Sequence, residues 1–318
     1  MSPSPLFTSI PPQLRGIRIG DLAASSLQVA IIRSWHEAGY RPISVNTSSE
    51  IERHPGLRSA FEHLGVESVV VSPPPGTSQR LRCSLIEFLG AIKSHAPDGP
   101  FAITNADIFI SKPEDTASWV SHLACDEQLL GQRLDVDAHR DGHPRLTPYL
   151  GGFDFFAMHR CSLDAVMPLL SPSLEIGLPW WDHLLPLALL ASSCRPRLVP
   201  STAFRHHSHG DRWRAADYCR VGIAATRHFA AVLRGSLAPT DPAAWLNIYE
   251  SLVQPSMGTT PVDRWSRAIF SRKRPIRLVA ARKLQLIAAA NVAFLLHAAA
   301  AGTPIAPTAG PTGPARSE

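Results

Sequence analysis

The first hundred residues alternate between short apolar runs and longer segments in which apolar residues recur every three to four positions. Leu27, Ile31 and Trp35 show the helical spacing most clearly, and Gly39 can end that helix. The runs predict strands at 5–10, 42–46, 66–71 and 101–104, and the periodic segments predict helices at 21–39, 56–64 and 78–95. This β-α-β-α-β-α-β order predicts an α/β fold with a mostly parallel sheet flanked by helices.

The pattern becomes less regular from Leu129 onward, as is common in a substrate-binding half. It predicts strands at 129–134, 147–158 and 197–199, and helices at 163–170 and 181–191. We therefore expect a domain over 1–215 with halves 1–110 and 111–215, a helical C-terminal appendage over 216–301, and a disordered tail over 302–318. The tail is rich in Pro, Thr, Gly and Ala, which cannot build a packed core.

The charge of the chain is concentrated in one late segment. The net charge is +5, and eight basic residues lie between Arg264 and Lys283. Such a local patch argues against nucleic acid as a partner and indicates a basic C-terminal region that faces a membrane. The following segment, Leu284 to Ala301, is apolar but carries polar residues and many alanines, so a packed or interfacial helix is favoured over a spanning one.

The cysteines and the N-terminus indicate a cytoplasmic protein. The basic C-terminal region adds the prediction of peripheral contact with the inner face of the membrane. The N-terminal residues lack a basic segment followed by an apolar run, so they do not resemble a secretory signal. The five cysteines are scattered without a C-x-x-C pair, which favours reduced core thiols over a disulfide framework or a zinc knuckle.

Polar residues follow several predicted strands at the point where each strand ends. In open α/β sheets this edge holds the ligand. The candidates are Thr8, Ser9, Asn46, Asn105 and Asp107. If 105–107 is extended, the side chains of Asn105 and Asp107 point to one side and suit a hard cation that carries a diphosphate. An Asx turn that closes the strand explains the same residues equally well.

Two further motifs place a carboxylate among aromatic residues. Gly152 permits close approach of a ligand or an unusual backbone, and Asp154 is either a hydrogen-bonded structural acid or a residue that contacts an acceptor. Asp182 begins a helix after Trp180 and Trp181, whose rings could stack on a sugar, and a fixed carboxylate there suits a general base. The alternative is a first-turn acid beside core tryptophans.

The fourth motif is the histidine cluster between His206 and His209. By strand alternation His207 and His209 could face one metal ion, and a solvated loop is the alternative. Nearby Arg212 and Arg214 could contact phosphate.

Taken together, the motifs resemble the GT-A-type glycosyltransferases of the nucleotide-diphospho-sugar transferase superfamily, and within it bacterial glycosyltransferase-like proteins. The resemblance spans roughly residues 5–215. It rests on short motifs in the right order: 7–10, 34–35, 44–46, 105–107, 152–155, 177–182 and 206–213.

The resemblance implies a GT-A-like, Rossmann-like catalytic domain that transfers a sugar from a nucleotide-diphosphate donor to a saccharide or other hydroxyl acceptor, assisted by Mn²⁺ or Mg²⁺. Asp107 matches the metal-binding last residue of the family's Asp-x-Asp motif, whereas Asn105 departs from its first Asp. His207 or His209 matches the late metal ligand and Asp182 the general base of inverting members. Gly152, Asp154, Trp180 and Trp181 are then expected near the acceptor.

Three alternatives remain from the sequence. A metallohydrolase of the metallo-β-lactamase type would use His207, His209 and Asp211, but Arg212 replaces its last histidine. A non-catalytic sugar-nucleotide-binding protein could share the fold. A dinucleotide-dependent oxidoreductase is disfavoured, since no G-x-G-x-x-G follows the first strand.

Overall fold

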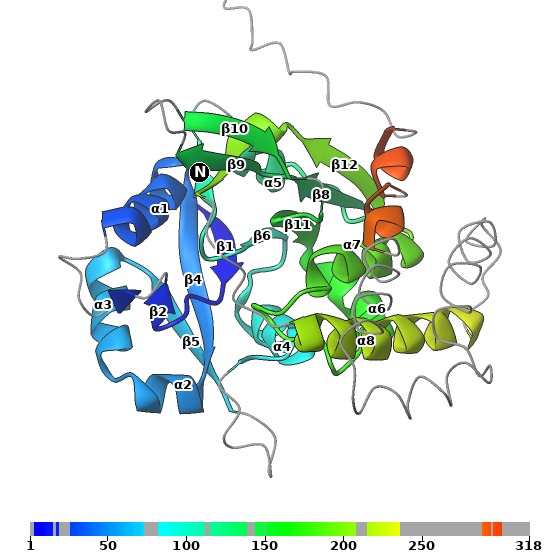
Figure 1. The fold of residues 1–318 in the computed structure, drawn as a ribbon, viewed down its shortest axis with the longest axis horizontal. Coiled ribbons are helices and arrows are strands. Elements are labelled where there is room, and N and C mark those ends of the chain that lie inside the picture. Colours follow the sequence, from blue (N-terminus) through cyan, green and yellow to red (C-terminus); the bar gives the residue numbers. More distant parts are fainter. Residues whose placement is uncertain are drawn as a thin grey trace, which may run out of the picture.

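The structure of the protein is a computed structural model (Figure 1). It describes residues 3–14, 17–18, 26–72, 82–111, 115–138, 144–149, 151–207, 215–235, 288–293 and 295–300. The predictions for the tail 302–318, for His209 and Asp211, and for the basic segment 264–283 lie outside these residues.

A seven-stranded sheet forms the centre of the molecule, with strand order β12-β8-β11-β6-β1-β4-β5 (Figure 1). All neighbouring strands run parallel except β11, which is antiparallel to both β6 and β8. The prediction of a mostly parallel, Rossmann-like α/β sheet is therefore confirmed. The strands are β1 (Ser4–Thr8), β4 (Tyr40–Thr47), β5 (Glu67–Val71), β6 (Pro100–Thr104), β8 (Glu127–Gly131), β11 (Phe155–His159) and β12 (Arg195–Val199).

Helices cover both faces of this sheet because successive strand residues point to opposite sides. On β1, Leu6 joins a core with α1, α3 and α5, whereas Phe7 joins a core with α4, α6, α7 and α8. The helices are α1 (Ser26–Glu37), α2 (Ser48–Arg53), α3 (Gly56–Leu64), α4 (Leu85–His95), α5 (Thr116–Ser121), α6 (Leu163–Val166), α7 (Trp181–Ala191) and α8 (Ala215–Gly235).

A second sheet lies against the main one, with strand order β10-β9-β13-β7. Its strands are β7 (Phe109–Ile110), β9 (Leu134–Ala138), β10 (Pro144–Pro148) and β13 (Phe204–His207). A short hairpin, β2 (Gln13–Leu14) with β3 (Ile17–Arg18), stands apart from both sheets. The second sheet was not predicted: the sequence segments 129–134 and 147–158 each contain a break, so each predicted strand divides between the two sheets.

The boundaries of several elements differ from the predicted ones for local reasons. The helix predicted over 78–95 begins at Leu85, because Ser84 and Glu87 form a capping box. The short helix α2, missed from the sequence, is capped by the side chain of Thr47.

The C-terminal helices pack on the same core as the main sheet. The buried core with α4 and α7 includes Val221 and Phe229 of α8, and Val292 and Leu295 of the helical residues 288–293 and 295–300. The buried amide of Asn291 contacts the ring of His183 on α7, with 3.5 Å between Nδ2 and Nδ1. Residues 288–293 and 295–300 thus take part in the fold, and strands from both predicted halves share the main sheet.

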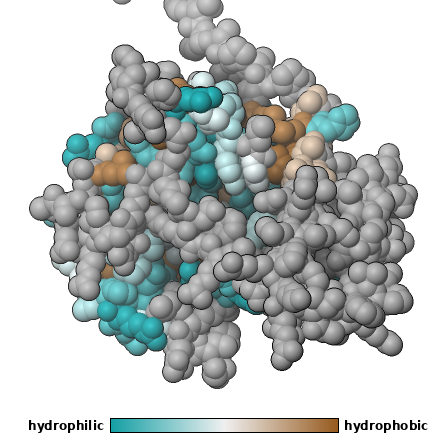
Figure 2. Space-filling view, viewed as in Figure 1, coloured by the Kyte–Doolittle hydropathy of each residue, from teal (hydrophilic) through white to brown (hydrophobic). Residues whose placement is uncertain are grey.

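Figure 2 shows a hydrophilic surface over α2 and a hydrophobic patch near residues 288–293 and 295–300. Among the helices that the structure describes, none combines the length and the apolar character needed to cross a bilayer.

Gly131, at the end of β8, allows the two sheets to meet. The rings of Phe155 and Phe204 stack there with centroids 4.6 Å apart. A Cβ built on Gly131 would lie 2.3 Å from Cε2 of Phe204 and 3.0 Å from Cβ of Phe155. The absence of a side chain therefore lets β13 approach β8.

We expect Gly131→Ala to destabilise the protein by about 1–3 kcal/mol, the usual cost of overpacking a core. The measurement is urea unfolding followed by circular dichroism. Gly56→Ala is the matched control, since a Cβ there meets nothing within 4 Å at the start of α3. Equal stability of the two variants would contradict the proposed contact.

Candidate functional site

The loop that follows β6 is held in place by α1. The amide Nε2 of Gln28 donates to the carbonyl of Ala106 at 3.1 Å, and the indole Nε1 of Trp35 donates to the carbonyl of Ile108 at 2.7 Å. The hydroxyl of Ser34 accepts from the backbone N–H of Ile110 at 3.1 Å. These buried contacts fix the position of Asp107 at the carboxyl edge of the sheet.

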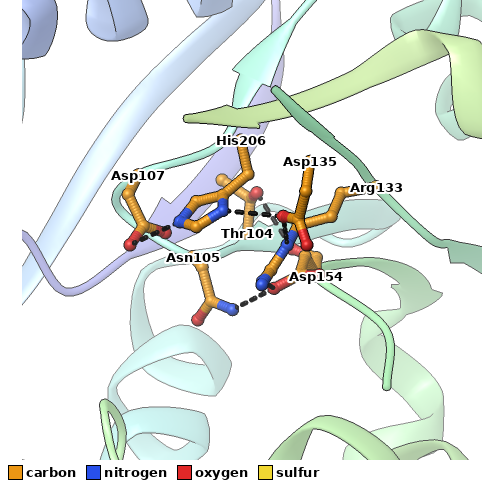
Figure 3. Close-up of polar contacts among 7 residues, drawn as sticks. All are labelled: Thr104, Asn105, Asp107, Arg133, Asp135, Asp154 and His206. Atoms are coloured by element: carbon orange, nitrogen blue, oxygen red, sulfur yellow. Dashed lines mark hydrogen bonds and ion pairs between the residues drawn. The ribbon is translucent and has the colours of Figure 1, made fainter. Parts of the chain in front are cut away.

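Residues 105–108 form a turn rather than an extended segment. The backbone N–H of Ile108 donates to the carbonyl of Asn105 at 3.3 Å. The prediction that Asn105 and Asp107 point to one side by strand alternation is therefore wrong. Asn105 points toward Asp154 and Asp107 toward His206 (Figure 3).

Asp154 is the buried anchor of this region, with a side chain only 2% exposed. Its Oδ1 accepts from Nη1 of Arg133 and from Nδ2 of Asn105, both at 2.7 Å. Its backbone carbonyl accepts from the N–H of Asn105 at 3.2 Å and the hydroxyl of Thr104 at 3.0 Å. An aspartate at position 105 would face Asp154 with a second negative charge, which gives a physical reason for the asparagine at this position.

The second sheet brings Asp107, Asp135 and His206 together (Figure 3). His206 of β13 is the register partner of Asp135 on the parallel strand β9, and Nδ1 of its ring lies 2.9 Å from Oδ1 of Asp135. On its other side β13 pairs with β7, which begins two residues after Asp107. Nε2 of His206 lies 3.6 Å from Oδ2 of Asp107.

His206 therefore occupies the position that sequence alternation assigned to His207. Along β13, Phe204 and His206 are buried, whereas Arg205 and His207 are exposed. The prediction that His207 faces the metal together with His209 is therefore not what the structure shows for His207, because its side chain points away from Asp107. His209 lies outside the described residues. The apolar Phe204 could have indicated the buried side of this strand, and His206, two residues later, lies on that same side.

The guanidinium of Arg133 bonds to two carboxyl groups in this site, those of Asp135 and Asp154. Burial alone would lower the pKa of Arg133, but the charges of Asp154 and Asp135 reverse this effect and raise it. Burial raises the pKa of Asp154, although Arg133 and the Asn105 amide oppose the rise. The excess of carboxyl groups, formed by Asp107, Asp135, Asp154 and Asp182, makes the region favourable for a cation.

Asp182 lies in the first turn of α7 and faces the glycine pair before β11. A Cβ on Gly152 would lie 2.2 Å from Oδ2 of Asp182, so the glycine permits close approach of this carboxyl group. Its other oxygen, Oδ1, is buried and has no hydrogen-bond partner. Burial and the charge of Asp154 raise the pKa of Asp182 to about 7, even though backbone N–H groups and Arg133 favour its ionised form.

The backbone that positions Asp182 is strained at Trp180, which has a φ of 92°. Its indole Nε1 donates to the carbonyl of Tyr218 on α8 at 2.9 Å, and its ring packs against Gly222. Trp180 is fully buried and Trp181 is 3% exposed. Neither indole is therefore exposed for stacking on a sugar, and both belong to the core, as the alternative interpretation held.

The remaining predicted residues at the sheet edge differ in their surroundings. Thr8 is buried and its hydroxyl has no hydrogen-bond partner, and Ser9 follows it at the end of β1. Asn46 is fully buried: its Nδ2 donates to the carbonyl of Ile10 at 2.9 Å and to Glu50 at 2.8 Å, and its Oδ1 accepts from Ser44. Its polar atoms thus connect β4 with α2 and with the segment that follows β1.

Sequence reasoning missed Arg133, Asp135 and Tyr149. The guanidinium of Arg133 donates to Asp135 at 2.8 Å and lies 3.9 Å above the ring of Tyr149. Burial and the neighbouring Asp182 and Asp154 raise the pKa of Tyr149. Asp135 lies on β9, Arg133 directly precedes β9 and Tyr149 directly follows β10, so all three belong to the second sheet or its flanks, which the sequence pattern did not predict.

Comparisons with known proteins leave the family of the chain open. No protein-family model and no curated protein matches it. Among solved structures it is similar to a UTP-bound UGPase from Acinetobacter baumannii (12% identity, 78% of this chain and 98% of that one, TM-score 0.35). It is also similar to the inositol-1-phosphate CTP transferase from T. maritima (11%, 75% and 99%, TM-score 0.36) and to HddC from Yersinia pseudotuberculosis (9%, 51% and 79%, TM-score 0.32). At these scores the similarity says nothing about activity.

The raised pKa of Asp182 predicts a specific dependence of stability on pH. Between about pH 4 and pH 7 the folded protein keeps a proton that the unfolded chain has lost, so this group makes stability fall as the pH rises. We expect Asp182→Asn to be more stable than wild type at pH 8, by at most about 4 kcal/mol, and to lose this advantage near pH 4.

Thermal unfolding of both proteins across this pH range is the measurement. Glu52→Gln, which changes an exposed carboxylate on α2, serves as the control and should track wild type. A stability difference for Asp182→Asn that does not change with pH would show that Asp182 is ionised in the folded protein.

Proposed function

We propose that this protein is a glycosyltransferase that uses a nucleotide-diphosphate sugar and a divalent cation. The observation that carries the proposal is the group of Asp107, His206 and Asp135 at the carboxyl edge of the sheet, with Asp182 beside it. Ligands of open α/β sheets bind at this edge. One of the similar solved structures is a UGPase bound to UTP and another is named a CTP transferase, but their similarity is too low to choose between reactions.

The residues present fit a cation between Asp107 and His206. The 3.6 Å between Oδ2 and Nε2 is too long for a good hydrogen bond. Two ligands that each lie about 2.1 Å from one ion stand roughly 3.0–3.4 Å apart, so a small movement would let both bind. The mixed oxygen and nitrogen donors suit Mn²⁺, and Mg²⁺ would rely mainly on the carboxylate.

Asp135 has the position of a residue that orients the metal ligand. Its Oδ1 can accept the proton on Nδ1 of His206, at 2.9 Å, and this tautomer leaves Nε2 free of a proton toward Asp107. Histidine ligands of metals commonly donate their other ring N–H to a carboxylate in this way. Arg133 in turn holds Asp135 through its Nε.

The division of roles follows from these positions. A bound cation would supply charge neutralisation for the departing nucleoside diphosphate. Asp182, whose raised pKa of about 7 keeps it basic near neutral pH, would take the proton of the acceptor hydroxyl. In this scheme Asp154 contacts neither the cation nor the acceptor, and it acts by fixing the positions of Arg133 and Asn105.

The metallohydrolase alternative has no supporting observation among the described residues. His207 is exposed on β13, away from the side on which His206 meets Asp107. The cytoplasmic location and the membrane contact of segment 264–283 stay predictions from the sequence.

The choice of His206 over His207 predicts distinct effects on Mn²⁺ affinity. We expect Asp107→Asn and His206→Ala to abolish Mn²⁺ binding at the proposed site, since each removes a direct ligand. Asp135→Asn should weaken it about 10–100-fold by loosening the orientation of His206. His207→Ala is the matched control on the neighbouring residue and should bind like wild type. Electron paramagnetic resonance of free Mn²⁺ measures all four, and loss of the site in His207→Ala would reverse the assignment.

The donor is tested by thermal shift with UDP-, GDP-, CDP- and dTDP-sugars, with and without Mn²⁺. A saturating donor at about 100 times its Kd should add about 2.7 kcal/mol of stability to wild type but not to Asp107→Asn. Donor turnover with release of a nucleoside diphosphate would support glycosyl transfer. Consumption of a nucleoside triphosphate with release of pyrophosphate would instead identify a nucleotidyltransferase, and no response to any nucleotide would reject both.

A further inference from the structure

Cys125 meets His159 and Cys161, which lie more than thirty residues later in the sequence, at the edge of the sheet opposite the candidate site. Cys125, His159 and Cys161 place one ligand atom each within 4.8 Å of one another. All four cysteines whose state the structure describes are free, and Cys125 and Cys161 are exposed. Among these four, Cys83 and Cys194 are buried, as the expectation of core thiols requires.

The topology of the main sheet explains this meeting. Because β11 runs against β6 and β8, its last residue, His159, lies beside Pro100 at the start of β6. Cys125 precedes the start of β8, and Cys161 follows the end of β11. Phe155, next to Asp154, begins the same strand, so the cluster lies roughly 13 Å along β11 from the candidate site.

Hydrogen bonds to neighbouring residues fix the positions of the cluster residues. The hydroxyl of Ser162 donates to the carbonyl of Cys125 at 3.2 Å. The thiol of the buried Cys194, which precedes β12, lies 3.5 Å from the same hydroxyl. The backbone N–H of Cys161 makes a long 3.4 Å bond to Nδ1 of His159, which fixes the ring near both thiols.

We propose that Cys125, His159 and Cys161 form a binding site for a thiophilic divalent cation, with zinc as the best fit. Two thiolates and an imidazole are ligands that zinc prefers, at about 2.3 Å and 2.0–2.1 Å. Tetrahedral ligands then stand about 3.5–3.8 Å apart, so the present spacing requires side-chain shifts of about an ångström. Exposure of both thiols leaves the fourth position for water or another solvent-borne ligand.

This site differs in chemistry from the group around Asp107. Oxygen-rich ligands there suit Mn²⁺ or Mg²⁺, whereas thiolates select zinc and similar soft ions. The proposal stands independently of the proposed function, and each site can be tested in a variant that lacks the other.

The test is titration of the full-length reduced protein with zinc chloride against a chromophoric chelator, with cobalt chloride as a spectroscopic substitute. We expect wild type to bind zinc tightly, and cobalt to give a thiolate-to-metal charge-transfer band that only sulfur ligands produce. Cys125→Ser and Cys161→Ser should each lose the tight zinc site and the band. Both positions are exposed, and circular dichroism verifies that the variants fold.

Two controls separate this site from others. Asp107→Asn should keep the charge-transfer band, since it alters only the oxygen-rich group. His63→Ala, which removes an exposed histidine of α3, should leave zinc affinity unchanged, whereas His159→Ala should lower it. Absence of the band in reduced wild type, its persistence in Cys125→Ser and Cys161→Ser, or a Cys125–Cys161 disulfide that forms in preference to metal binding would each overturn the proposal.

Discussion

The buried carboxylate of Asp154 is the constraint on which the candidate site depends. A charge this deeply buried is costly unless it is paired, and here Arg133 and Asn105 both bond to one of its oxygens. Through these bonds the start of β11, the loop after β6 and the connection between the two sheets become one unit. Arg133 also donates a hydrogen bond to Asp135, which fixes this carboxylate, and Asp135 in turn orients the ring of His206.

The second sheet adds a histidine and a carboxylate to the region around Asp154. Strand β13 lies between β7 and β9, so its one buried histidine meets Asp135 on one side and approaches Asp107 on the other. The same strand packs Phe204 on Phe155 over Gly131, which ties the site to the core of the main sheet. Asp182 reaches the region from a third direction, on a helix whose strained N-cap residue, Trp180, bonds to α8.

The two edges of the main sheet offer contrasting ligands. At the carboxyl edge the side chains are carboxylates with one imidazole, in partly buried surroundings with few compensating positive charges. At the opposite edge they are thiols with one imidazole, close to the surface. The reversed direction of β11 creates this contrast, because its start joins the first group and its end joins the second.

The sequence by itself determined the α/β class, the four parallel strands of the first half, the helix at 181–191 and the placement of Asp107 just after a strand. These features depend on local periodicity and on caps, which nearby residues decide. The tertiary structure alone decided which side chains meet. Asn105 and Asp107 diverge because their loop turns, the tryptophans at 180 and 181 enter the core, and His206 rather than His207 faces Asp107. Arg133, Asp135 and the cluster of Cys125, His159 and Cys161 depend on strand pairing between distant segments, which no local pattern records.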